Sequence, residues 1–139
     1  MTNRQMSEIL RNQKPLTLPP EASVQEACRH MHARRVGAVL VTDAKGALQG
    51  IFTGRDAVRV LAGAKDPAAT ALRQVMTRDP VTLPPGRTAI EALRLMHDGG
   101  FRHVPVVQDG SVVGVVSRGD FRGLEQDRLD EETGLWERI

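Results

Sequence analysis

The sequence predicts a mixed α/β (α+β) fold built from two copies of one β-α-β-β-α unit. Three observations lead to this prediction. The segment 15–20 (PLTLPP) returns 65 residues later as 80–85 (PVTLPP). Each copy continues with the apolar spacing of an amphipathic helix. β-branched runs separated by polar turns then follow each helix, as is typical of hairpins.

The first helix of each copy is predicted from a cap and an apolar stripe. Ser23 is followed three residues later by Glu26, and Thr88 by Glu91, which is the pattern of a capping box. Apolar residues then recur at the i, i+3, i+4, i+7 spacing of one buried helix face. These residues are Val24, Ala27, Cys28 and Met31 in the first copy, and Ala89, Ala92, Leu93 and Met96 in the second.

Two paired strands and a second helix are predicted to follow. The strands span 36–42 and 48–53 in the first copy, and 104–107 and 112–117 in the second. The turn between them is one residue longer in the first copy, a change that a surface hairpin tolerates. The second helix is expected to begin near Thr53 or Ser117, and in the first copy to end around Gly63.

The domain organisation follows from this duplication. We expect repeats at 6–63 and 71–124, a linker at 64–70 and a C-terminal tail at 125–139. One repeat buries too little apolar surface to be stable alone, so the two are expected to pack as one pseudo-two-fold module. The tail carries Leu135, Trp136 and Ile139. It is either solvated or anchored on the module or on a second subunit.

Composition argues against several classes of protein. The formal net charge is only +2, and aromatic residues are 3% of the chain with no Tyr, so nucleic-acid binding is not expected. No apolar run approaches the roughly 18 residues of a membrane span, and the first residues lack the apolar core of a signal peptide. Cys28 is the single cysteine and cannot form an internal disulfide. We therefore expect a cytoplasmic protein.

Neither metal binding nor catalysis is predicted. His30 and His32 are two residues apart on a predicted helix and point to different faces, unlike a metal-binding pair. The chain has no Ser-His-Asp order, paired-carboxylate spacing or phosphate-cradling glycine loop. We expect no enzyme activity and no required cofactor.

Four motifs resemble those of the CBS repeat family. The segments 50–56 (GIFTGRD) and 114–120 (GVVSRGD) are similar to its Gly-hydrophobic-x-Thr/Ser-x-x-Asp signature. The segment 75–81 (VMTRDPV) resembles the family's repeat entry, and 101–107 (FRHVPVV) resembles its Pro-Val strand. The resemblance covers residues 6 to 123. It implies a small stand-alone Bateman module, which is a pair of CBS repeats.

The Thr/Ser-x-x-Asp positions allow two compatible interpretations. One is a capping box, which satisfies free backbone N–H groups and the helix dipole. The other is a ligand site, because a helix N-terminus with a hydroxyl attracts anions and an adjacent Asp can accept bonds from both ribose hydroxyls. The resemblance implies the second use as well. It assigns Asp56 and Asp120 as ribose acceptors, with Thr53 and Ser117 near phosphate.

The resemblance further implies two unequal sites, each built from both repeats. The first has a hydroxyl, a carboxylate, cations and an apolar slot, and contains Thr53, Arg55, Asp56, Met76, Thr77, Pro80, Arg102, His103 and Val104. The second has fewer cations, and contains Asn12, Pro15, Val36, Gly37, Ala38, Ser117, Arg118 and Asp120. We expect the second site to take a less charged ligand or to stay empty. For His103, a phosphate contact and an ordinary surface position both stay open.

The expected function is that of a non-catalytic regulatory sensor. The resemblance implies binding of AMP, ADP, ATP or a related adenosyl ligand in the cleft between the repeats, with occupancy passed on to an effector protein. It also implies a homodimer, which an apolar stripe of Ala57, Val58 and Leu61 supports indirectly. Two alternatives remain: a ligand-independent dimeric scaffold, and an ACT-like repeat that binds amino acids.

Overall fold

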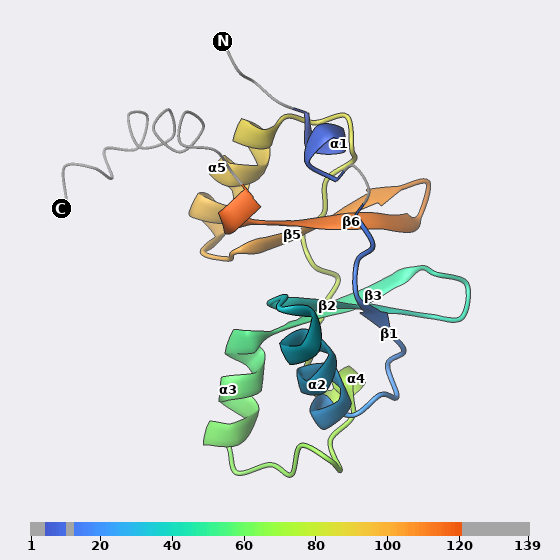
Figure 1. Ribbon diagram of the computed structural model, residues 1–139, viewed down its shortest axis with the longest axis vertical. Coiled ribbons are helices and arrows are strands. Elements are labelled where there is room, and N and C mark those ends of the chain that lie inside the picture. Colours follow the sequence, from blue (N-terminus) through green and yellow to red (C-terminus); the bar gives the residue numbers. More distant parts are fainter. Residues whose placement is uncertain (1–4, 11–12, 121–139) are drawn as a thin grey trace, which may run out of the picture. The chain divides into compact units, whose positions relative to one another are not determined.

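The computed structural model describes residues 5–10 and 13–120, which form two compact units (Figure 1). We call residues 14–80 with 109–112 the N-repeat unit. The C-repeat unit contains the remaining described residues, from 5–10, 13, 81–108 and 113–120. Both units combine helices with a sheet, which confirms the mixed α+β fold class.

The N-repeat unit has a four-stranded sheet in the order β1-β2-β3-β4. Its strands are β1 (Thr17–Leu18), β2 (Ala38–Thr42), β3 (Leu48–Thr53) and β4 (Thr77–Arg78). β1 is parallel to β2, and the other neighbours are antiparallel. Figure 1 shows three helices on one side of this sheet: α2 (Val24–Arg34), α3 (Gly54–Ala62) and α4 (Leu72–Val75).

The C-repeat unit contains most of the hairpin of β5 (His103–Gln108) and β6 (Ser111–Ser117), whose residues 109–112 are grouped with the N-repeat unit. Asp109 and Gly110, at the turn, have φ values of 53° and 81°, as a two-residue type I′ turn requires. The unit also contains the helices α1 (Met6–Ile9) and α5 (Ala89–Gly99), and a 3₁₀ turn, η1 (Arg118–Asp120).

Each unit includes the entry segment of the other repeat. In the N-repeat unit, Leu72 belongs to the buried cluster around Phe52, and Met76 packs against that cluster. In the C-repeat unit, Met6 and Leu10 join the cluster around Val104. The compact units therefore exchange their entry segments, because the short helices at 6–9 and 72–75 bury their apolar residues against the neighbouring repeat's strands. The repeat boundaries remain a prediction from sequence.

Gly50 permits the close approach of β4. A Cβ atom at this position would lie 2.7 Å from both the Met76 sulfur and the Thr77 carbonyl oxygen, which is closer than atoms in contact can approach. β4 pairs directly with this part of β3, Gly50 with Arg78 and Ile51 with Thr77. The glycine of the first Gly-hydrophobic-x-Thr-x-x-Asp motif thus has a packing role.

The predicted helix caps and apolar stripes are present. Ser23 accepts a hydrogen bond from the Glu26 N–H at 3.0 Å, and Thr88 forms the complete capping box with Glu91. Of the eight predicted stripe residues, seven are buried and Cys28 is partly buried, where burial raises the pKa of its thiol. None of the helices in the described ranges is long and apolar enough to span a membrane.

Two predicted elements differ in extent. β2 begins at Ala38 rather than at Val36, because α2 ends in a left-handed Arg35 and the Val36 N–H bonds back to the Met31 carbonyl. After Ser117, the described chain forms the 3₁₀ turn η1, and the remainder of the predicted helix lies outside the described residues. The predicted tail, with Leu135, Trp136 and Ile139, also lies outside them, as does Asn12.

Candidate functional site

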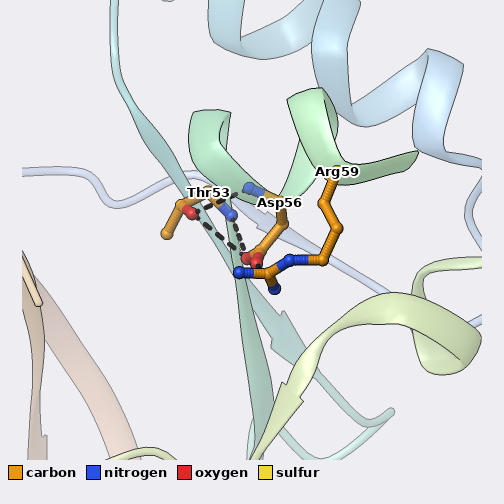
Figure 2. A network of polar contacts seen from close by, with 3 residues as sticks. All are labelled: Thr53, Asp56 and Arg59. Atoms are coloured by element: carbon orange, nitrogen blue, oxygen red, sulfur yellow. Dashed lines mark hydrogen bonds and ion pairs between the residues drawn. The ribbon is translucent and has the colours of Figure 1, made fainter. Parts of the chain in front are cut away.

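The first Thr-x-x-Asp motif forms a complete capping box at the start of α3 (Figure 2). The backbone N–H and the hydroxyl of Thr53 donate to Asp56 Oδ2 at 2.9 and 3.1 Å. In return, the Asp56 N–H donates to the Thr53 hydroxyl oxygen at 3.4 Å. The capping interpretation is therefore confirmed, and it fixes a carboxylate that is only 6% exposed.

Arg59 binds the other oxygen of the same carboxylate. Its Nη1 lies 3.2 Å from Asp56 Oδ1, and Figure 2 shows the guanidinium against the carboxylate. The Arg59 side chain is 72% exposed, whereas that of Asp56 is 8% exposed. Both oxygens of Asp56 are thus engaged, one by the cap and one by a solvent-accessible cation.

Thr53 ends β3, which has β2 as its neighbour on one side and β4 on the other. Ala38 is the cross-strand partner of Thr53, and the Gly37 carbonyl accepts a hydrogen bond from the Gly54 N–H at 3.1 Å. Thr77, exposed on β4, pairs with Ile51. The N-repeat unit therefore contains ten of the predicted site residues, three of them from the entry segment of the second repeat: Pro15, Val36, Gly37, Ala38, Thr53, Arg55, Asp56, Met76, Thr77 and Pro80.

The C-repeat unit repeats the hydroxyl–carboxylate geometry. The backbone N–H of Ser117 donates to Asp120 Oδ2 at 2.7 Å, and its hydroxyl donates to the same oxygen at 3.2 Å. The Arg118 N–H donates to the Arg102 carbonyl at 3.0 Å. The end of β6 is therefore joined directly to the residue that precedes β5.

His103, at the start of β5, lies in the electrostatic field of this group. Burial lowers the pKa of His103, the charge of Asp120 acts in the opposite direction, and that of Arg102 lowers the pKa further. A neutral imidazole is thus favoured in the ligand-free unit, and a nearby anion would favour its protonation. Arg102, His103, Ser117, Arg118 and Asp120 form what we call the C-repeat group.

The prediction that places Arg102, His103 and Val104 with Thr53 and Asp56 joins the two units and stays a prediction. The same holds for Val36, Gly37 and Ala38 with Ser117 and Asp120. In the structure, each strand lies beside the motif of its own repeat, because the two strands of one hairpin are direct neighbours. Within the C-repeat unit, Arg102 and His103 therefore lie at the same end of the hairpin as Ser117 and Asp120.

Two contacts were not predicted. Arg59 follows Asp56 by three residues, a spacing at which helical side chains meet, so this pair could have been anticipated. The side-chain oxygen of Gln13 accepts a hydrogen bond from the Val115 N–H at 2.7 Å. No sequence signal indicated this contact, because it joins residues at opposite ends of the chain.

A surface depression lies elsewhere in the N-repeat unit. It has a volume of about 350 Å³ and is lined by residues 17–21 and 42–44, at the opposite end of β2 from Ala38. His30 and His32 are exposed on α2. Within the described ranges, no three His, Cys, Asp or Glu side chains are placed to hold a metal ion.

Comparison with known proteins identifies both halves of the chain as CBS domains. The family described as CBS domain matches residues 6–63 and 72–126. The CBS domain-containing protein CBSCBSPB3 of Arabidopsis thaliana is 45% identical over 108 residues, which is 77% of this chain and 19% of that protein. The chain spans about a fifth of such plant relatives. YhcV of Bacillus subtilis is 34% identical over 75% of this chain and 74% of its own length.

Solved structures give the same result. The CBS domain protein PAE2072 from Pyrobaculum aerophilum, complexed with AMP, matches with a TM-score of 0.82 at 26% identity, covering 91% of this chain and 98% of that one. The CBS domain pair of MJ0100, in complex with 5′-methylthioadenosine and S-adenosyl-L-methionine, has a TM-score of 0.79 at 26% identity, covering 95% and 99%. Given the duplicated motifs and fold and these matches, this chain belongs to the CBS domain family as a pair of CBS repeats.

Proposed function

We propose that the chain is a non-catalytic regulatory module that binds a phosphorylated adenosine, with AMP as the first candidate, at the C-repeat group. The observation that carries this proposal is the gathering of a carboxylate, a hydroxyl and three basic side chains at one end of a single hairpin. Relatives of the same fold are complexed with AMP or with other adenosyl compounds.

Each member of the group has a chemical role in this proposal. The Asp120 carboxylate accepts hydrogen bonds from ribose hydroxyls, which are neutral donors that an anionic acceptor binds strongly. The guanidinium groups of Arg102 and Arg118 contact the phosphate, and His103 becomes protonated beside it. At the corresponding strand positions, the N-repeat has Gly37 and Ala38. The phosphorylated ligand is therefore assigned to the C-repeat.

The proposal also includes a location in the cytoplasm and the transmission of ligand occupancy to a separate effector protein. ADP and ATP are the other candidate ligands besides AMP. The main rival is a scaffold that binds no nucleotide, in which the Thr/Ser-x-x-Asp motifs serve only as caps. The capping bonds described above fit both accounts, so ligand binding itself has to distinguish them.

A thermal shift series tests the proposal. A ligand at about 100 times its dissociation constant adds roughly 2.7 kcal/mol to the free energy of unfolding. For a chain of this length, this raises the midpoint of thermal unfolding by about 5–15 °C. We expect such a rise with AMP and a smaller or absent rise with GMP at the same concentration.

The controls for this series separate the rival functions. ADP, ATP, S-adenosylmethionine and a panel of free amino acids are measured at the same concentration. A rise with an amino acid alone would favour an ACT-like sensor. No rise with any compound would leave the ligand-free scaffold as the better account.

We also propose that two chains associate through α3. Val58 and Leu61 are each 65% exposed on this helix, whereas Ala57 packs against the buried cluster of its own unit. Two large apolar side chains exposed one turn apart are stabilised when another surface covers them. Leu61→Glu is expected to shift the sedimenting species from dimer to monomer, while Val81→Glu, at another exposed valine, leaves the dimer intact. A monomeric wild-type chain would contradict this proposal.

A further inference from the structure

Asp56, the carboxylate of the first Thr-x-x-Asp motif, has a cation bound to it in the structure. In the N-repeat unit, Arg59 forms an ion pair with Asp56 Oδ1 at 3.2 Å, while the cap occupies Oδ2 (Figure 2). Arg59 follows Asp56 by three residues on α3, a spacing at which two helical side chains meet.

The geometry points to a role for Arg59 in ligand binding. We propose, on the basis of the proposed function, that Arg59 competes with ribose for Asp56 and so weakens adenosyl binding at this site of the N-repeat unit. A ribose that uses Asp56 as its acceptor must take over the oxygen that Arg59 now holds. Arg59 therefore lowers the affinity of this site for ribose, because the ligand must displace its guanidinium from Asp56.

The burial of the two partners determines which one moves. Asp56 is 6% exposed and is fixed by three bonds with Thr53. Arg59 is 72% exposed and reaches the carboxylate from the solvent side. Its guanidinium can leave and regain hydration at little cost, whereas the carboxylate cannot turn without breaking the cap. Displacement by ligand therefore releases Arg59 and leaves the start of α3 unchanged.

The size of the effect follows from the exposure of the pair. An ion pair whose cation is largely exposed to solvent is screened and contributes little to stability, and the same limit applies to the penalty that Arg59 imposes on a competing ligand. We expect removal of Arg59 to strengthen binding at the N-repeat site by about two- to five-fold. The penalty also decreases with ionic strength, because salt screens an exposed pair.

The experiment uses adenosine, which has the ribose hydroxyls but no phosphate that a released arginine could attract. Isothermal titration is carried out on the 139-residue chain with Asp120→Asn, which removes the charge of the proposed ribose acceptor in the C-repeat group. Adding Arg59→Ala to this chain is expected to raise adenosine affinity about two- to five-fold. Lys65→Ala, which removes an exposed cation beyond α3, and Arg59→Lys, which keeps a cation, are expected to leave it near the starting value.

A second measurement distinguishes competition from a change in folding. Raising the ionic strength from about 0.05 to about 0.5 M is expected to strengthen adenosine binding when Arg59 is present and not when it is Ala. An unchanged or weaker affinity in Arg59→Ala would overturn the inference, as would an absence of adenosine binding in the Asp120→Asn chain. In either case, AMP binding by the wild-type chain would leave the proposed function intact. Absence of AMP binding by the wild-type chain would refute both the proposed function and the role of Arg59.

Discussion

Asp120→Asn is expected to weaken AMP binding by roughly 10- to 100-fold. The substitution keeps the shape of the side chain and an oxygen that can accept the Ser117 N–H, so the local turn is preserved. It removes the negative charge that makes Asp120 a strong acceptor for ribose hydroxyls. Hydrogen bonds to charged groups contribute about 1.5–3 kcal/mol, which corresponds to this loss of affinity. Isothermal titration with AMP measures it.

The matched control for this variant is Asp98→Asn. Asp98 is exposed on α5 in the same unit, so the control removes the same charge at a position outside the C-repeat group. AMP affinity in this control is expected to equal that of the wild-type chain. Equal affinity in Asp120→Asn, with the fold intact by circular dichroism, would show that Asp120 is only a cap.

Phe52→Ala is expected to lower the free energy of unfolding of the N-repeat unit by about 3–5 kcal/mol. Phe52 is fully buried on β3, in one cluster with side chains from α2, α3, α4 and the neighbouring strands. Removing the ring loses its transfer free energy and leaves a cavity that these fixed elements cannot close. Urea-induced unfolding measures the effect, from the midpoint and the slope of the transition.

Two comparisons make the Phe52 result specific. Val81→Ala truncates an apolar side chain that is 48% exposed, and is expected to change the free energy of unfolding by less than about 0.5 kcal/mol. The buried clusters of the two units share no residue. Amide hydrogen exchange in Phe52→Ala is therefore expected to increase first in α2, β2 and β3. A loss below about 1 kcal/mol would contradict the described packing of β3.

Much of the fold could be predicted because its determinants are local. The Ser23 and Thr88 caps depend on residues three positions apart, and the buried faces of α2 and α5 on a spacing of three and four. The Asp109-Gly110 turn depends on two residues that adopt positive φ. Each of these caps, helix faces and turns is determined by residues only a few positions apart, so a single sequence is enough to predict it.

The grouping of the site residues could not be predicted in the same way. Arg102 and Arg118 are far apart in sequence and become neighbours through the pairing of the β5–β6 hairpin. Thr77 pairs with β3 because Gly50 leaves room for β4. The family resemblance implies sites that combine strands of one repeat with the motif of the other, and this assignment stays a prediction. Within the C-repeat unit, the hairpin places Arg102 and His103 at the same end as Ser117 and Asp120.

The central claim is that AMP binds at the C-repeat group, and a titration of the ¹⁵N-labelled chain followed by two-dimensional NMR tests both the binding and its place. The account predicts saturable shifts in the backbone amides of Arg102, His103, Ser117 and Arg118. In Asp120→Asn, the same shifts should require about 10- to 100-fold more AMP to reach half saturation. Shifts confined to the depression at residues 17–21 and 42–44, or no shifts at any concentration of AMP, would contradict it.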